Sequence, residues 1–219
     1  MIRAIIFDIG GVIALDVWEH MLVDHENSLA KKYQLDHYKV FQYGKILWEE
    51  FSYLKASQSS EWDELEKKYW KKFTSKFNID DSIDEIINLT DKFILPLNGM
   101  VTLLDQLSQK KIKLAICSNN IEFWLQRQIS KLKLYNYFEL PNIIVSCRTG
   151  ISKTSPGFEM FKEAVKALKV EKEHCLFVDD RLENIELALK FGLKTILFPH
   201  ESEFGAIYLK ALFKEMGII

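Results

Sequence analysis

The stretch AIIFDIGGV at residues 4–12 determines how the rest of the chain is interpreted. Its first half, Ala4–Phe7, is a short apolar run, and Asp8 and a pair of glycines follow it closely. A run of this length bounded by turn residues is typical of a strand that is buried on both faces. The stretch therefore predicts a buried strand with the carboxylate of Asp8 at its carboxyl end.

Apolar runs of similar length recur along the chain, and stretches with helical spacing separate them. In one such stretch, Met100, Leu103 and Leu107 recur at intervals of three or four residues. Buried strands that alternate with amphipathic helices are typical of βαβ units and a parallel sheet. We therefore expect an α/β fold with a Rossmann-like parallel sheet core and helices on both of its faces. The remaining strands are predicted at Leu114–Cys117, Asn142–Val145, Cys175–Val178 and Thr195–Phe198.

Residues 16–94 interrupt this alternation, because no run of strand length occurs there. Apolar residues such as Trp62 and Tyr69 instead recur at helical spacing. We expect an inserted α-helical cap at residues 16–94, and an α/β core that is formed by residues 1–15 and 95–219.

The composition limits the classes of partner. The 219-residue chain is 48% hydrophobic and 27% charged, with a formal net charge of −2. This balance is typical of a globular protein and gives no positive field that would attract nucleic acid or an anionic membrane. The stretch KKYWKKF at residues 67–73 interleaves lysines with rings, as single-strand binding surfaces do. On a helix, however, its rings continue an apolar stripe while its lysines face water, so we expect no nucleic-acid partner.

Two features indicate the cellular compartment. The first apolar run is too short to span a bilayer and lacks the flanks of a secretory signal, so we expect no membrane association. Cys117, Cys147 and Cys175 are an odd number of cysteines without metal-like spacing. Unpaired cysteines favour a reduced, cytoplasmic protein.

Carboxylates follow two of the predicted strands. Asp8 follows the first strand, and Asp179 and Asp180 follow the run Cys175–Val178. In an open parallel sheet, ligands bind beyond the carboxyl ends of the strands. Carboxylates gathered there would repel one another without a cation, and their hard oxygen atoms suit Mg²⁺. The sequence therefore predicts a magnesium site at this edge.

A hydroxyl group and a lysine are expected at the same edge. Ser118 and Asn119 follow a predicted strand, and Lys153 precedes a predicted helix. A lysine and a hydroxyl beside a metal can bind a phosphoryl group. The sequence therefore predicts a site for a phosphoryl group at this edge.

In their order and spacing, these segments resemble the four motifs of the haloacid dehalogenase-like hydrolase superfamily, in the subfamily with a helical cap inserted after the first motif. The resemblance covers nearly the whole chain, with motifs at Phe7–Val12, Ser118, Lys153 and Asp179-Asp180. It implies a Mg²⁺-dependent phosphatase whose partner is a small phosphorylated metabolite, and in which Asp8 attacks phosphorus and forms an aspartyl-phosphate.

The resemblance also implies a set of metal ligands. Asp8, the backbone carbonyl of Gly10 and Asp180 would bind Mg²⁺ directly, and Asp179 would act through water or by orienting its neighbours. A plain structural role competes for the pair Asp179-Asp180, because acidic residues are favoured at a helix N-terminus.

The phosphoryl group would be held by a second set of residues. Ser118 and the backbone of Asn119 would bind a phosphoryl oxygen, and Lys153 would neutralise both Asp8 and the transferring group. The alternative for Ser118 is a helix N-cap, and the alternative for Lys153 is an ordinary surface lysine.

The chain departs from the family at Gly10. Phosphatases of the family usually carry a second aspartate there, two residues after the nucleophile, which protonates the leaving oxygen and later activates water. General acid–base catalysis contributes about 10²–10⁴-fold to a rate. Asp16 is the candidate substitute, with Glu19 and His20 behind it. The alternative is that Asp16 caps the first cap helix, which is expected near Trp18.

Other functions follow if no residue replaces the missing acid. The enzyme would then use substrates with good leaving groups, such as acyl phosphates or anomeric sugar phosphates, or the protein would bind a phosphorylated ligand without turnover.

A 2-haloacid dehalogenase of this fold is a competing function, and it would use arginine to hold its substrate. The chain has four arginines, which are Arg3, Arg127, Arg148 and Arg181. None of them lies in the predicted cap, which disfavours a dehalogenase.

The resemblance implies that the cap closes over the site and selects the substrate. We expect hinges where the chain crosses between cap and core, near Leu15–Val17 and Leu95–Asn98. Three cap lysines, Lys39, Lys45 and Lys55, could reach a substrate anion. The chain is compatible with a monomer or a homodimer.

Overall fold

The computed structural model describes residues 1–55, 59–199 and 204–219. Five strands form one parallel sheet in the order β3-β2-β1-β4-β5. Each strand begins and ends within one residue of the run that predicted it, so the expected parallel α/β core is confirmed. The strands are β1 (Ala4–Phe7), β2 (Lys113–Ser118), β3 (Ile143–Val145), β4 (Cys175–Asp179) and β5 (Lys194–Leu197).

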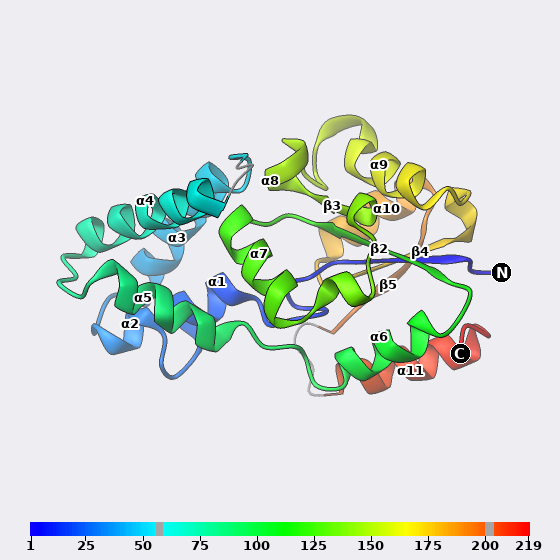
Figure 1. Ribbon diagram of the computed structural model, residues 1–219, viewed down its shortest axis with the longest axis horizontal. Coiled ribbons are helices and arrows are strands. Elements are labelled where there is room, and N and C mark those ends of the chain that lie inside the picture. The colour runs from blue at the N-terminus through cyan, green and yellow to red at the C-terminus, as the bar shows by residue number, and fades with distance from the viewer. Residues whose placement is uncertain (56–58, 200–203) are drawn as a thin grey trace.

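Helices cover both faces of the sheet (Figure 1). They are α6 (Met100–Ser108), α7 (Glu122–Lys131), α9 (Glu159–Leu168), α10 (Leu182–Phe191) and α11 (Gly205–Glu215). Because side chains alternate along a strand, Ile5 and Phe7 face the apolar core formed with α6, α7 and α11, whereas Ala4 and Ile6 face the core formed with α9 and α10. Both faces of β1 are therefore buried, as its continuous apolar run predicts.

Short elements complete the core between these helices. They are η3 (Leu134–Asn136), η4 (Leu140–Asn142), α8 (Ser146–Thr149), η5 (Pro156–Phe158) and η6 (Lys172–His174). The central strand β1 pairs with β2 on one side and with β4 on the other. The carboxyl ends of these strands carry Asp8, Ser118 and Asp179, so the sheet brings three of the predicted site residues to one edge.

A helical segment is inserted after β1, as predicted. It consists of α1 (Val17–Glu19), η1 (His20–Asp24), α2 (Leu29–Lys32), α3 (His37–Phe51), α4 (Ser59–Phe77), α5 (Ile83–Thr90) and η2 (Asp91–Phe93). Local signals fix some of these bounds. At the start of α5, the hydroxyl of Ser82 accepts from the backbone N–H of Glu85, and the Glu85 carboxylate accepts from the N–H of Ser82.

The inserted helices pack around an aromatic core. Tyr69, Trp70 and Phe73 of α4 are fully buried, whereas the neighbouring lysines Lys67 and Lys71 are exposed. The basic and aromatic stretch of α4 therefore forms an amphipathic helix with its rings inside, which supports the interpretation preferred from the sequence.

The inserted segment is fastened to the core at two places. Where the chain crosses, the N–H of Leu15 donates to the carbonyl of Leu95 at 3.0 Å, and the N–H of Leu97 donates to the carbonyl of Ile13 at 2.9 Å. The second fastening is α7 of the core, whose residues Ile121, Phe123 and Trp124 at its N-terminal end belong to the aromatic core of the inserted helices.

An ion-pair network reinforces the contact at α7. The Arg127 guanidinium lies 2.6 Å from the Glu66 carboxylate of α4 and 2.7 Å from that of Asp91 in η2. The side chain of Glu66 is 1% exposed, so its charge is compensated inside the contact.

Two further sequence expectations concern the compartment. Cys117, Cys147 and Cys175 are free and buried. Among the helices of the described ranges, none is both long and apolar enough to cross a membrane.

Candidate active site

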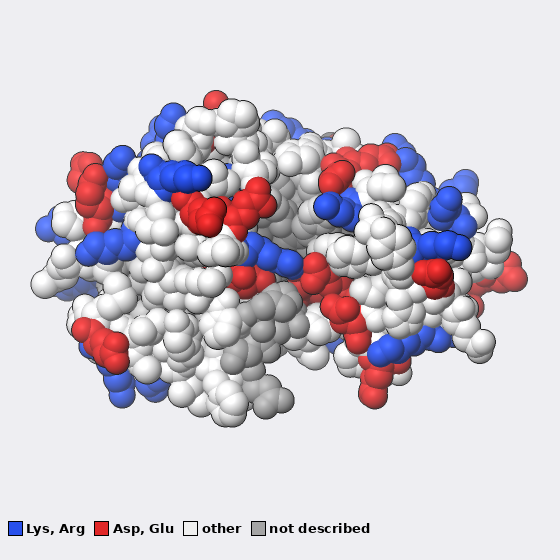
Figure 2. Space-filling view, turned by 180° about the vertical axis from the view of Figure 1, so that it is seen from behind, with Lys and Arg blue, Asp and Glu red and all other residues white. Residues whose placement is uncertain are grey.

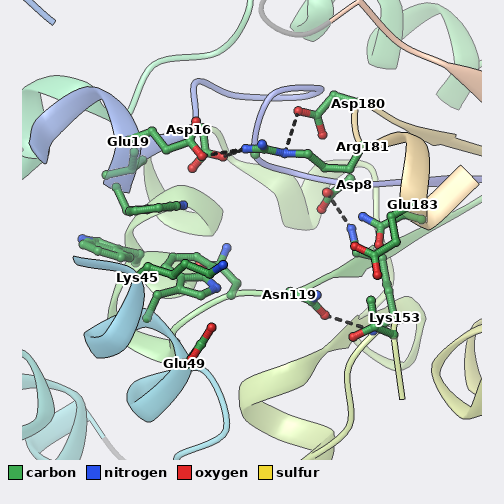
Figure 3. Close-up of a pocket in the computed structure, with 18 of the residues that line it drawn as sticks. Asp8, Asp16, Glu19, Lys45, Glu49, Asn119, Lys153, Asp180, Arg181 and Glu183 are labelled. Atoms are coloured by element: carbon green, nitrogen blue, oxygen red, sulfur yellow. Dashed lines mark hydrogen bonds and ion pairs between the residues drawn. The ribbon is translucent and has the colours of Figure 1, made fainter. Parts of the chain in front are cut away.

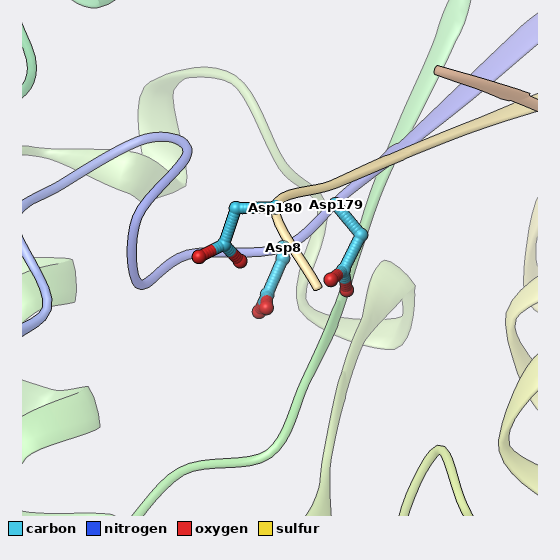
Figure 4. Close-up of side chains that lie close together, drawn as sticks. All are labelled: Asp8, Asp179 and Asp180. Carbon is cyan, nitrogen blue, oxygen red and sulfur yellow. The ribbon is translucent and has the colours of Figure 1, made fainter. Parts of the chain in front are cut away.

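The carboxylates of Asp8, Asp179 and Asp180 gather at the carboxyl ends of β1 and β4. One carboxylate oxygen of each residue lies within 4.8 Å of a carboxylate oxygen of the other two. Figure 4 shows the three side chains extending toward the same side of the strand ends. Oxygen atoms at this spacing could hold a small hard cation such as Mg²⁺, and the sheet thus brings together the three carboxylates that the sequence placed at this edge.

Lys153 lies between two of these carboxylates. Its Nζ atom is 2.6 Å from Oδ2 of Asp8 and 2.6 Å from Oδ2 of Asp179, and its side chain is 1% exposed. Burial acts to lower the pKa of Lys153, but the two carboxylates outweigh it and raise that pKa. Burial raises the pKa of Asp8 to about 7, while Lys153 acts to lower it. Lys153 is therefore a buried cation of the site and not a surface lysine.

Asp179 is held by a dense set of donors. Its Oδ1 accepts from the backbone N–H of Arg181 at 2.8 Å, and the Asn184 amide donates to both of its oxygens at 3.0 and 3.1 Å. With Lys153 also bonded to Oδ2, Asp179 is fully buried and oriented on all sides. These donors orient the carboxylate of Asp179, for which the resemblance implies an indirect role.

Ser118 and Asn119 lie at the end of β2. Ser118 is 1% exposed, and its hydroxyl donates to the Asn119 carbonyl at 3.4 Å. The N-cap residue of α7 is Ile121 and not Ser118. The alternative of Ser118 as a helix N-cap is therefore not realised. Asn119 holds the Lys153 segment, because its Oδ1 accepts from the backbone N–H of Lys153 at 3.1 Å.

The carboxylate of Asp16 occupies the space beside Gly10. A Cβ atom added to Gly10 would lie 3.6 Å from both Cγ and Oδ2 of Asp16. Asp16 stands at the N-cap position of α1, but its side chain makes no capping hydrogen bond. It lies instead on the site, where burial and the nearby Glu19 raise its pKa to about 7 against the opposing effect of Arg181.

Arg181 links these groups across the mouth of the site. Its Nη2 atom lies 3.1 Å from Oδ2 of Asp16 and 2.9 Å from Oε1 of Glu19, and its Nε atom lies 3.4 Å from Oδ2 of Asp180. In Figure 3 the side chain extends from beside Asp180 toward Asp16. Arg181 thus connects the edge of the sheet to the first turn of the inserted helices.

A pocket of about 410 Å³ joins these groups to the inserted helices. Figure 2 shows acidic and basic side chains around the hollow between the two parts of the molecule. From the core, the pocket is lined by Asp8, Gly10, Asn119, Lys153, Asp180 and Arg181. From the inserted helices and α7, it is lined by Asp16, Trp18, Phe41, Lys45, Trp48 and Trp124. Lys45 is thus the one cap lysine of the three predicted candidates that lines this pocket.

Sequence reasoning missed the bridging role of Arg181, and it did not identify which aromatic residues line the pocket. The predicted cap contains many rings at helical spacing, and most of them form its core, so spacing alone does not single out Phe41 or Trp48. Trp124 lies on a core helix, and its place in the wall depends on how α7 docks against the cap.

Comparisons with known proteins agree with this geometry. Residues 5–198 match the family model described as haloacid dehalogenase-like hydrolase. Flavin mononucleotide hydrolase 1 of Arabidopsis thaliana is 33% identical over 104 residues, which are 48% of this chain and 40% of that protein. Glyceraldehyde 3-phosphate phosphatase of Pyrococcus abyssi is 34% identical over 83 residues, which are 37% of this chain and 32% of that protein. The alignments thus span less than half the length of either relative.

A solved structure supports the fold. A HAD family enzyme from Bacteroides thetaiotaomicron superposes with a TM-score of 0.68 at 18% identity, and the match covers 94% of this chain and 98% of that chain. The family model covers most of this chain, from β1 through the end of β5. This chain therefore belongs to the haloacid dehalogenase-like hydrolase family, and its inserted helices form the cap that follows the first strand.

Proposed function

We propose that the protein is a Mg²⁺-dependent phosphomonoesterase that hydrolyses a small phosphorylated metabolite through an aspartyl-phosphate on Asp8. The observation that carries the proposal is the buried cluster in which Lys153 lies 2.6 Å from both Asp8 and Asp179, with Asp180 beside them. The names of the two curated relatives, a flavin mononucleotide hydrolase and a glyceraldehyde 3-phosphate phosphatase, support a phosphate monoester as substrate.

The metal would be held by Asp8, Asp180 and the backbone carbonyl of Gly10, with Asp179 orienting the set. Three carboxylates and one lysine leave the cluster with an excess of negative charge, which suits a divalent cation. When bound, Mg²⁺ supplies positive charge that offsets the carboxylates and the phosphoryl oxygens.

Asp8 would act as the nucleophile. One of its carboxylate oxygens would attack phosphorus as the bond between phosphorus and the ester oxygen breaks, and the phosphoryl group would be carried on Asp8 as an acyl phosphate. The backbone N–H of Ile9 donates to Oδ1 of Asp8 at 2.7 Å and orients the carboxylate, while Lys153 stabilises negative charge on the transferring group. Ser118 and the backbone of Asn119 would bind the remaining phosphoryl oxygens.

We assign the missing acid–base role to Asp16. Its carboxylate lies 3.6 Å from where a Cβ atom of residue 10 would stand, so it occupies the region that a side chain at that position would reach. Protonated Asp16 would give its proton to the departing alkoxide. The resulting carboxylate would take a proton from water as the water oxygen attacks phosphorus, which releases inorganic phosphate and restores Asp8.

The cap, residues 16–94, would enclose the substrate, and the core would consist of residues 1–15 and 95–219. The hydrogen bonds between the two crossings at Ile13–Leu15 and Leu95–Leu97 support a hinge at that point. Three buried free cysteines support a reducing compartment such as the cytoplasm.

The test is a turnover assay with Mg²⁺ on sugar 1-phosphates, sugar 6-phosphates, nucleotides and acetyl phosphate. The wild-type protein is compared with the Asp8→Asn variant and with wild type in chelator. We expect turnover that requires both Asp8 and Mg²⁺. Silence across the panel with Mg²⁺ still bound would favour a phosphate-binding protein, and chelator-resistant release of chloride from a chlorinated acid would favour a dehalogenase.

A further inference from the structure

We propose that the cap side of the pocket binds a planar heteroaromatic ring, so that the substrate is a monophosphate whose alcohol carries such a ring, as nucleotides and flavin mononucleotide do. As a statement about the substrate, this inference rests on the proposed phosphatase function. As a statement about the binding site, it rests on the side chains that line the pocket and can be tested without turnover.

Four aromatic side chains form a continuous row along the pocket. Phe41 lies 5.4 Å from Trp18 between ring centroids, Trp18 lies 5.7 Å from Trp48, and Trp48 lies 5.6 Å from Trp124. The interplanar angles of these three pairs are 30°, 31° and 24°. All four rings line the pocket, so its wall is a row of rings in which each is tilted by 24–31° from the next.

Most ring pairs inside the cap have a different geometry, although Phe73 and Phe77 are tilted by 48°. Tyr69 meets Phe51 at 81° and Trp70 at 78°, and Trp70 meets Phe73 at 80°. Edge-to-face packing of this kind is common where rings fill a core. The pocket wall instead aligns its rings, which is the arrangement onto which a further flat ring can stack.

The exposure of the four rings divides them into two roles. Trp124 and Trp18 are buried, at 1% and 9% exposed, whereas Phe41 and Trp48 of α3 are partly exposed. The buried pair therefore holds the position of the partly exposed pair. Phe41 stands at one end of the row and is the ring on which a ligand can stack, whereas Trp48 lies between Trp18 and Trp124 and is reached only through its partly exposed part. Any flat base can stack on an aromatic side chain. This wall should therefore favour ligands that carry an aromatic ring, without distinguishing strongly between one ring and another.

Polar groups stand beside the rings where the edge of a heteroaromatic ligand would lie. Lys45 and Glu49 of α3, one helical turn apart, also line the pocket. In Figure 3 they lie across the pocket from Asn119 and Lys153. Lys45 can donate to ring nitrogen or carbonyl acceptors, and Glu49 can accept from ring N–H groups.

The two sides of the pocket thus have separate functions. The phosphate goes to Asp8 and Lys153 at the strand ends, and the ring goes to Phe41 and Trp48 on the cap. A volume of about 410 Å³ lies within the range of small-molecule sites, which is about 300–1,000 Å³.

Matched substrate pairs test the inference. Flavin mononucleotide is compared with ribitol 5-phosphate, and AMP with ribose 5-phosphate. Within each pair the phosphate is carried by the same kind of primary alcohol, so a difference in kcat/KM reports the ring. We expect the ring-bearing member to be favoured by roughly 5- to 150-fold in at least one pair, and which pair responds distinguishes a flavin from a nucleotide.

Variants on α3 show whether the cap wall causes the preference. Trp48→Leu and Phe41→Leu should bring the ratio within the responding pair toward one. The control is Tyr38→Leu, because Tyr38 lies on the same helix, is 71% exposed and does not line the pocket, and this variant should keep the wild-type ratio. A preference that survives both wall variants would overturn the inference.

Binding to the Asp8→Asn protein separates this inference from the proposed function. Calorimetric titration should give tighter binding of the ring-bearing member of the responding pair, with Mg²⁺ present. If acetyl phosphate is hydrolysed in an Asp8-dependent manner but both pairs bind and react equally, the ring site is wrong and the phosphatase stands. If nothing is hydrolysed but the ring-bearing member binds tighter, the ring site stands and the phosphatase is wrong.

Discussion

The strand-end side of the pocket and the cap side position their side chains by different means. At the strand ends, Asp8, Asp179 and Lys153 are buried and joined by hydrogen bonds of 2.6 Å. On the cap side, Trp48 is placed by ring contacts with Trp18 and Trp124 at centroid distances of 5.6–5.7 Å. Short polar contacts in a buried site are directional, whereas ring contacts tolerate small shifts.

This difference separates chemistry from selection. The strand-end groups must hold a fixed geometry toward phosphorus, and each has few tolerable replacements. The cap wall must provide a flat apolar surface, which several combinations of rings can supply. Changes at the strand ends should therefore lower turnover or stability strongly, and changes on the cap should alter which substrate is preferred.

The largest effect is expected from Asp8→Asn. The amide keeps the shape of the side chain but is a poor nucleophile, so turnover should fall by roughly 10⁴-fold or more. The measurement is kcat with saturating Mg²⁺ on the best substrate of the panel. The free energy of unfolding in urea serves as the control and should not fall, because the change removes one of three clustered negative charges. Turnover within tenfold of wild type would contradict the assignment of Asp8.

Lys153→Met should affect stability as well as turnover. The change leaves Asp8 and Asp179 buried without their cation, and breaking a buried ion pair in this way typically costs about 3–5 kcal/mol. The measurement is the free energy of unfolding in urea without Mg²⁺, and added Mg²⁺ should restore part of the loss. Lys45→Met is the matched control, because Lys45 is exposed on the cap. Equal stability of the two variants would show that the buried cluster is not held by Lys153.

Asp16→Asn should act selectively on poor leaving groups. We expect the rate of phosphoryl transfer to Asp8, measured in a single turnover, to fall by about 10²-fold for sugar 6-phosphates and much less for acetyl phosphate, whose leaving group needs no proton. Asp24→Asn is the control, since Asp24 is an exposed carboxylate of the inserted helices that does not line the pocket. A uniform loss across both leaving groups, or none, would remove Asp16 from the acid role.

The smallest effect concerns the contact between cap and core. Arg127→Met leaves Glu66 buried without its partner, and the free energy of unfolding should fall by about 2 kcal/mol. The exposed pair Lys72–Glu50 offers a control, because Lys72→Met should change stability little. If both variants unfold alike, the α7 contact does not fasten the cap.

The residues on the strand-end side could be predicted because the sheet topology determines which strand ends lie together. Apolar runs of strand length located β1, β2 and β4, and parallel strands bring Asp8, Ser118 and Asp179 to one edge whatever the details of packing. Lys153 was expected at the same edge because it precedes a predicted helix, and the contact of Asn119 with its backbone shows how the fold holds it.

The cap side was not predictable, because it depends on how helices dock. Helical spacing identified the buried rings of α4. Phe41 and Trp48 have the same kind of spacing in α3, and only the packing of α3 beside α7 places these two rings in the pocket. Arg181 is similar, since nothing local indicates that a residue after Asp180 reaches Asp16 in the first turn of the cap. Such contacts join segments that are far apart in the sequence.

The central claim is that Asp8 carries the phosphoryl group and that Asp16 helps to release it. The most direct measurement is rapid acid quench of protein mixed with acetyl phosphate and Mg²⁺, followed by mass spectrometry that locates the phosphoryl group. We expect an adduct on Asp8 that is short-lived in the wild type and accumulates in Asp16→Asn, because formation needs no acid but hydrolysis needs a base. An adduct on another residue, or turnover with no adduct on Asp8 in either protein, would contradict the account.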